Sequence, residues 1–176
     1  MKKIFLTSLI IFVTSFSLPE VLDEYLVEHS GVVYQIDSDK PYTGKGLSYH
    51  SNGQIGGITT YKNGEIIDQE SYYDHGQLDY KGTYKNGEIS LEEYYYPDGK
   101  LEFRDVYENG ELVEEKDYYE NGQLAYEATY KNGEIVQEEE YYENGQLRYK
   151  ATYKNGNLIQ EELYYENGEK IDASNY

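Results

Sequence analysis

The chain of 176 residues contains no cysteine and no tryptophan, and only three prolines. The absence of cysteine excludes disulfides, thiolate metal sites, a cysteine nucleophile and a lipid-modified cysteine. Basic residues are also few: 15 stand against 34 acidic residues, and the net charge is −19. Because a chain this acidic repels phosphate backbones and anionic lipids, we expect no nucleic-acid partner and no strong binding to anionic membranes.

Only one long apolar run is present, Ile4 to Val13. Two lysines precede it and the small residues Ser15 and Ser17 follow, a pattern typical of a secretory signal peptide. We therefore expect residues 1–17 to be removed and the protein to be exported to the periplasm, the cell envelope or the exterior. The alternative is an uncleaved membrane anchor, for which the run is short of the roughly 20 residues that a spanning helix needs.

Glycine and tyrosine are abundant, and they are regularly spaced. The 24 tyrosines, with regular leucine and isoleucine, supply apolar surface that disordered acidic chains lack. Eleven of the 17 glycines alternate in steps of 11 and 12, at positions 53, 64, 76, 87, 99, 110, 122, 133, 145, 156 and 168. Nine of these eleven follow asparagine, and Asn-Gly pairs favour tight hairpin turns, with residues typical of strands between them.

This spacing predicts an all-β fold, an elongated single-sheet antiparallel meander of repeated β-hairpins with a 23-residue period. We expect a twisted ribbon or trough of some twelve strands. Residues 18–50 are expected to form a capping segment, with two short strands around Ser30 and Gly31, and residues 51–176 the repeat array. About 159 residues after the signal peptide correspond to one domain, which we expect to be a monomer.

An odd period requires one residue to be absorbed in each repeat, since identical two-residue turns would send equivalent side chains to opposite faces. We predict two-residue loops at the "KNG" turns and three-residue loops with a left-handed glycine at the "YENG" turns. Tyr118 then lies opposite Leu124, and Tyr130 opposite Ile135. Both aromatic-aliphatic ladders are expected to share one face.

A middle row of aromatic residues is predicted between the ladders, and it is our candidate protein-binding surface. We expect it to comprise Tyr80, Phe103, Tyr126 and Tyr149, interleaved with Glu70, Glu93, Lys116, Glu139 and Glu162. On the opposite face Lys81, Arg104 and Lys150 are expected beside Glu92, Glu115, Glu138 and Glu161. Alternatively, the tyrosines merely cover a single-layer sheet.

A possible acidic cluster is predicted on the charged face. Glu127 occupies a position where other repeats carry a base, and our register places it between Glu115 and Glu138. Such a cluster could receive a basic group or a cation, although exposed acids are usually only solvated. The three histidines do not converge, so we expect no catalytic residue, no metal site and no cofactor.

The strings "YYENGQL" and "YKNGEI", preceded by "KPYTGKG", resemble the bacterial variant of the MORN repeat, the family that includes YwqK-type antitoxin components. The pattern falls on Tyr118, Tyr119, Asn121, Gly122 and Leu124, then on Tyr130, Asn132, Gly133 and Ile135. The resemblance implies a β-hairpin scaffold that binds partners without catalysis.

We therefore expect an exported, non-enzymatic scaffold that binds another protein. The alternatives are an antitoxin or immunity-type inhibitor of a partner toxin, and a lipid-directed or phosphatidylinositol-phosphate-kinase-like module. No phosphate-cradling loop or catalytic-loop signature supports a kinase.

Removal of the first 17 residues is directly testable. Mass spectrometry of the protein purified from its native host should give an N-terminus near Leu18, because the apolar start shares nothing with the repeats. A mature N-terminus at Met1 would contradict the prediction.

Overall fold

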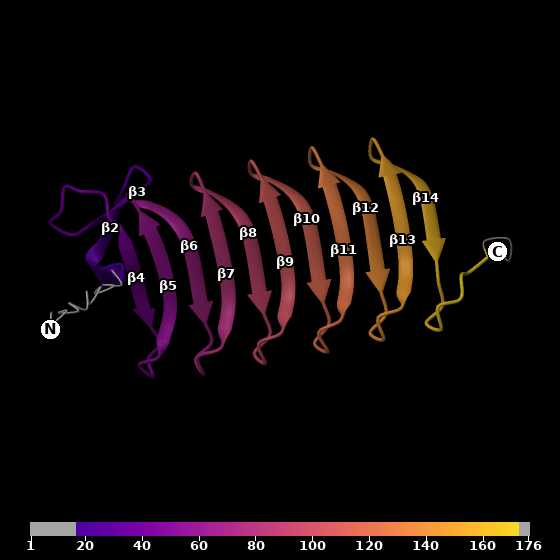
Figure 1. The fold of residues 1–176 in the computed structure, drawn as a ribbon, viewed down its shortest axis with the longest axis horizontal. Coiled ribbons are helices and arrows are strands. Elements are labelled where there is room, and N and C mark those ends of the chain that lie inside the picture. The colour runs from indigo at the N-terminus through magenta and orange to yellow at the C-terminus, as the bar shows by residue number, and fades with distance from the viewer. Residues whose placement is uncertain (1–16, 173–176) are drawn as a thin grey trace, which may run out of the picture.

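A computed structural model describes residues 17–172, so the predicted signal peptide lies almost entirely outside the described residues. Twelve strands form one open sheet, in the order β1-β4-β5-β6-β7-β8-β9-β10-β11-β12-β13-β14 (Figure 1). Only β1 and β4 are parallel. The predicted all-β meander is confirmed. Its strands are β1 Glu20–Leu22, β4 Gly44–Tyr49, β5 Ile55–Lys62, β6 Glu65–Tyr72, β7 Leu78–Lys85, β8 Glu88–Tyr95, β9 Leu101–Glu108, β10 Glu111–Tyr118, β11 Leu124–Lys131, β12 Glu134–Tyr141, β13 Leu147–Lys154 and β14 Asn157–Leu163.

The two kinds of turn have the predicted loop lengths, with one exception: the "YENG" string of residues 107–110 forms a two-residue loop, in which Glu108 pairs with Glu111 and Asn109 is left-handed. At a "KNG" turn both Asn132 (φ 53°) and Gly133 (φ 73°) are left-handed, as a two-residue hairpin loop requires. At a "YENG" turn the Tyr119 amide donates to the Gln123 carbonyl at 2.8 Å, which closes a three-residue loop. Gly122 in that loop has φ 88°. The pairs Tyr118–Leu124 and Tyr130–Ile135 are also present as predicted.

Each hairpin, however, contains a further bulge that the sequence analysis did not include. In the hairpin of β11 and β12 the extra residue is Val136, and in that of β10 and β11 it is Ala125. Because the period is odd, the residue numbers of a cross-strand pair must add up to an odd number in one of the two hairpins of each repeat and to an even number in the other. Each bulge changes its own hairpin from one case to the other. The two bulges together therefore exchange the two hairpins, and the repeat remains equally regular.

The exchanged register places the two tyrosine ladders on opposite faces, so the prediction of a shared face is wrong. The Tyr130 hydroxyl donates to Glu115, whereas the Tyr141 hydroxyl donates to Glu127 and Glu139. Glu127 pairs with Glu139, and Glu115 with Ala128, which is adjacent to Glu127 along β11. Since successive side chains of a strand point to opposite faces, each ladder covers a different side.

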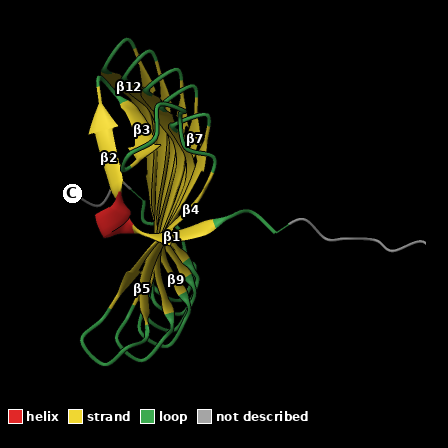
Figure 2. Cartoon of the chain, turned by 90° about the vertical axis from the view of Figure 1, so that its left-hand side faces the viewer, coloured by secondary structure: helices red, strands yellow, loops and turns green. Residues whose placement is uncertain are grey.

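The N-terminal end is covered by a small second sheet, β2 (Leu26–His29) and β3 (Val32–Gln35), joined by Ser30 and Gly31 as predicted. A 3-10 turn, η1 (Asp23–Tyr25), precedes it. The Val33 amide donates to the Gly64 carbonyl at 2.9 Å and thus ties this hairpin to the β5–β6 turn. Figure 2 shows the hairpin beside the end of the strongly twisted sheet.

The sheet has no second layer over most of its length, and its buried interior is small. Within residues 17–172, the buried hydrophobic residues are Tyr42, Ala128 and Ala151. Stability must therefore come from strand pairing and from cross-strand side-chain contacts of about 0.2–1 kcal/mol each.

The left-handed turn glycines make a testable contribution. Gly133→Ala should lower the free energy of unfolding by about 1–2 kcal/mol, because φ +73° strains any residue with a Cβ while no atom lies within 4 Å of the added methyl group. Urea denaturation measures the loss. The exposed Lys131→Ala variant is the control, and equal stability of the two variants would contradict the prediction.

Candidate binding surface

The aromatic row that we predicted as a binding surface exists, with different neighbours. Tyr94 lies between Tyr80 and Phe103, with ring centroids 4.7 Å and 4.4 Å away. Sequence analysis missed Tyr94 because the predicted register assigned its place to Glu93. The row reads Ser71, Tyr80, Tyr94, Phe103, Asp117, Tyr126, Glu140 and Tyr149. The expected interleaving by Glu70, Glu93, Lys116, Glu139 and Glu162 is therefore wrong, and the bulges are the physical cause.

An acidic row runs beside the aromatic row, on the same face. Glu92, Asp105 and Glu115 are consecutive cross-strand partners at its centre. Farther along, Ala128 separates Glu115 from Glu138. The face that carries both rows is hereafter the aromatic face.

The predicted cluster of Glu115, Glu127 and Glu138 does not form. Glu127 pairs with Lys116 and Glu139 on the opposite face, and its carboxylate lies 3.6 Å from the Lys116 ammonium group. The shifted register is again the reason. Three acids on neighbouring strands do lie side by side, but they are Glu92, Asp105 and Glu115.

Tyrosine hydroxyls connect the acidic row to the rings around it. Tyr126 and Tyr153 both donate to Glu138, Tyr126 at 3.3 Å. Ala128, with 1% of its surface exposed, is two residues from Tyr126 on the same face. Small residues under the rings thus allow tyrosines to lie across the sheet and reach the carboxylates.

Asp105 is electrostatically the most unusual residue of the face. Burial, followed by the nearby Glu115 charge, raises the pKa of this carboxyl to about 6, although the Tyr107 hydroxyl opposes the shift. Its Oδ1 is buried and has no hydrogen-bond partner among the described residues. Tyr126 is affected similarly, since burial raises the pKa of its phenol to about 12. On this face burial therefore favours the protonated form of the Tyr126 phenol and disfavours the charged form of the Asp105 carboxyl.

The opposite face carries a row of ion pairs. Lys81, Arg104 and Lys150 do not lie beside Glu92, Glu115, Glu138 and Glu161 as we had predicted, because their cross-strand neighbours belong to the row of Glu70, Glu93, Lys116, Glu139 and Glu162. The Arg104 guanidinium lies 2.7 Å from Glu114, and the Lys150 ammonium 2.6 Å from Glu139. Such partly exposed pairs contribute about 0–1 kcal/mol each. On this face bases therefore lie beside several of the acids.

His50 and His75 form hydrogen bonds with backbone carbonyls of the next repeat. In the repeats the second tyrosine of "YY" donates to a carbonyl 22 residues ahead, as Tyr119 does to Tyr141 at 2.6 Å. The Nε2 of His50 lies 2.7 Å from the Tyr72 carbonyl in the same manner, and that of His75 3.0 Å from the Pro97 carbonyl. A carbonyl can only accept, so both nitrogens act as donors.

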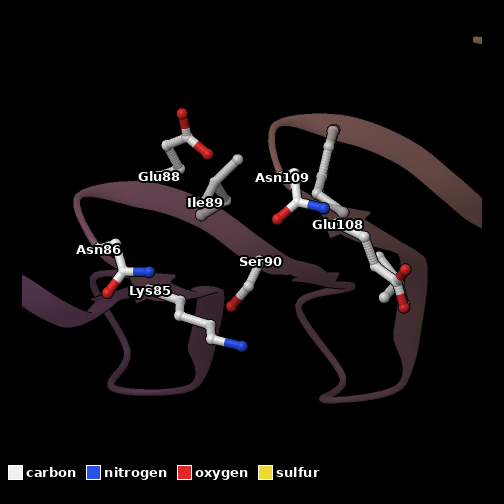
Figure 3. Close-up of a pocket in the computed structure, with 9 residues that line it drawn as sticks. Lys85, Asn86, Glu88, Ile89, Ser90, Glu108 and Asn109 are labelled. Atoms are coloured by element: carbon white, nitrogen blue, oxygen red, sulfur yellow. The ribbon is translucent and has the colours of Figure 1, made fainter. Parts of the chain in front are cut away.

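A further surface feature of the described residues lies at the turns along one edge of the sheet. A depression between the two-residue turns at Asn86 and Asn109 is flanked by side chains that point in different directions (Figure 3). No three His, Asp or Glu residues within 17–172 are arranged to hold a metal ion. Across the same residues no helix is long and apolar enough to cross a membrane.

A single-layer antiparallel sheet built from one repeated hairpin, with different rows on its two faces, defines a β-repeat protein. The MORN repeat variant model matches five segments of the chain, 42–63, 67–86, 91–109, 111–132 and 136–155. The protein belongs to the MORN repeat variant family. No curated protein matches its sequence.

Solved structures with local similarity are much larger proteins. A chain of the glycosylation-associated protein Gap123 complex of Streptococcus agalactiae is 17% identical with a TM-score of 0.38, over 59% of this chain and 20% of that one. A TarM mutant of S. aureus, solved with Fondaparinux, α-GlcNAc-glycerol and UDP, is 11% identical with a TM-score of 0.33, over 66% of this chain and 21% of that one. The chain thus spans about a fifth of the length of these proteins.

Asp105 gives the candidate surface a pH-dependent signature. A folded-state pKa near 6, above the ordinary 3.8, means that its contribution to stability decreases as pH rises from about 4 to about 6. The Asp105→Asn variant should therefore melt at a higher temperature than wild type at pH 7, by a margin that shrinks towards pH 4. Thermal melts at both values measure it, with Glu120→Gln in an exposed turn as the control. A margin independent of pH would contradict the prediction.

Proposed function

We propose that this protein is an exported, non-enzymatic scaffold that binds another protein on the aromatic face. One observation supports this most strongly. The neighbouring rings of Tyr80, Tyr94 and Phe103 lie on an open sheet beside a row of carboxylates, with no second layer of the described residues over them. Aromatic residues with polar surroundings are common energetic centres of protein interfaces.

The chemistry of the aromatic face indicates what the partner should carry. Apolar side chains would cover the rings, and basic side chains would lie over Glu92, Asp105 and Glu115. A base over this row would also favour the charged form of the Asp105 carboxyl, whose pKa is raised by burial and by the Glu115 charge. Binding to a positively charged partner would be fast, because an acidic surface attracts it before contact.

We propose export because of the N-terminal sequence. We propose a role without catalysis because no reactive side chains converge among the described residues. The described His50 and His75 are engaged with backbone carbonyls. Acting as an inhibitor of an exported toxin would be a special case of this function, and the identity of the partner would distinguish it. Lipid-directed binding is disfavoured by the net charge of −19.

The test compares the two faces of one sheet. The purified protein is used to isolate partners from the cell envelope, which are identified by mass spectrometry, purified, and titrated by calorimetry. Tyr126→Ser with Tyr149→Ser should weaken the affinity about 30-fold or more, since central aromatic anchors contribute roughly 2 kcal/mol or more.

The matched control is Tyr95→Ser with Tyr141→Ser, which removes two rings from the opposite face and should leave the affinity within a few-fold of wild type. Circular dichroism verifies that both variants are folded. If the Tyr126 and Tyr149 variant is folded and binds as wild type does, the rings of Tyr126 and Tyr149 only cover the sheet and do not bind the partner.

A further inference from the structure

The Asn-Gly pairs of the turns are chemically reactive as well as structural. In such a pair the backbone nitrogen of glycine can attack the side-chain amide carbon of the asparagine, since glycine has no Cβ to hinder the approach. The product is a deamidated residue. The chain contains nine of these pairs, which begin at Asn52, Asn63, Asn86, Asn109, Asn121, Asn132, Asn144, Asn155 and Asn167.

The three-residue turns hold both reacting groups in hydrogen bonds. At Asn121 the amide of the following glycine, Gly122, donates to a carbonyl within the turn at 2.7 Å. The Asn121 Oδ1 accepts from the Gln123 amide at 2.8 Å, and its Nδ2 donates to the Glu143 carbonyl of the next repeat at 2.7 Å. Asn144 has the same three contacts. Nucleophile and target are therefore both fixed.

Four two-residue turns leave the same groups free. Within residues 17–172 their asparagine side chains form no hydrogen bond, and their glycine amides donate none. All eight residues are exposed, and Asn86 and Asn109 flank the depression of Figure 3. Water therefore has access to these turns, which are Asn86–Gly87, Asn109–Gly110, Asn132–Gly133 and Asn155–Gly156.

The two-residue turn at Asn63 differs because the N-terminal cap covers it. Gly64 is buried, and its amide donates to the Tyr42 carbonyl at 2.7 Å. The string "YKNGE" is nevertheless the same around Asn63, Asn86 and Asn132. The sequence next to an asparagine thus does not decide whether its turn is engaged.

The string "YENG" provides a second matched pair. It surrounds Asn109, whose two-residue turn is open, and Asn121, whose three-residue turn is held by the contacts described above. Attack requires the turn to open, because the glycine nitrogen must rotate towards the side chain. The turn at Asn121 must first break those contacts, and the turn at Asn109 has none of them to break.

We propose that Asn86, Asn109, Asn132 and Asn155 are sites of spontaneous deamidation in the folded protein, and that the other Asn-Gly pairs are protected. The glycine nitrogen forms a bond to Cγ, the bond from Cγ to Nδ2 breaks, and ammonia leaves with the proton of the glycine amide. Water then opens the cyclic imide at either carbonyl, which gives aspartate or isoaspartate. This inference does not depend on a partner at the aromatic face.

The four sites lie along one edge of the sheet, since their turns join β7 to β8, β9 to β10, β11 to β12 and β13 to β14 (Figure 1). Each reaction replaces a neutral amide by a carboxylate, so this edge becomes more acidic. Isoaspartate also adds one carbon to the backbone of a two-residue turn, which changes the loop length that sets the hairpin register.

The test uses the whole purified protein, incubated in mildly alkaline buffer, because the attacking nitrogen must lose its proton. Samples taken over time are digested, and mass spectrometry measures the deamidated fraction at each asparagine. Asn109 should react at least about tenfold faster than Asn121, and Asn86 at least about tenfold faster than Asn63, because protected turns must break additional hydrogen bonds.

The control is the same protein unfolded in urea. There the members of each matched pair have the same neighbours and no fold, so their rates should agree within a few-fold.

Three results would overturn the proposal. Equal rates at Asn109 and Asn121 in the folded protein would show that the turn contacts do not protect. A selectivity that persists in urea would assign it to the sequence rather than to the fold. Loss of reaction at all four open turns in the folded protein, while the unfolded chain reacts, would show that two-residue turns protect their asparagines as well.

Discussion

Pairing of each strand with the next is the interaction on which this structure depends. A sheet without a second layer cannot bury a conventional core, and among the described residues the buried hydrophobic side chains are Tyr42, Ala128 and Ala151. Register must therefore be held hairpin by hairpin. The left-handed Asn-Gly and glycine turns do this locally, and the repeats extend the same solution along the ribbon.

Tyrosine suits this construction because one side chain has two uses. Its ring covers neighbouring small residues, and its hydroxyl reaches a carboxylate or a carbonyl at the edge of the covered area. Tyr126 and Tyr141 illustrate this on opposite faces, donating to Glu138 and to Glu139. An acidic chain can thereby remain a folded ribbon whose surface is also suited to contact with other proteins.

The two faces nevertheless differ in what they leave unsatisfied. Bases on one face neutralise the acids beside them, as Lys150 does for Glu139. On the aromatic face Glu92, Asp105 and Glu115 are neighbours without a base between them in their row. Since this difference arises from the pairing register, a shift of one residue would have distributed the charges differently.

The sequence by itself determined the architecture of this protein. Glycine spacing, Asn-Gly pairs and residues of high strand propensity are local signals, and local signals suffice for turn type, strand length and a meander in which Tyr118 opposes Leu124 and Tyr130 opposes Ile135. Only the tertiary structure decided which rows share a face. The odd period requires the two hairpins of each repeat to differ in register, but it does not say which hairpin has which register. Bulges at residues such as Val136 and Ala125 decide this. For this reason Tyr94 belongs to the aromatic row, and Glu127 does not belong to the acidic row. The sequence could not predict either placement, because the position of a bulge depends on packing between strands and is not marked by a particular residue type.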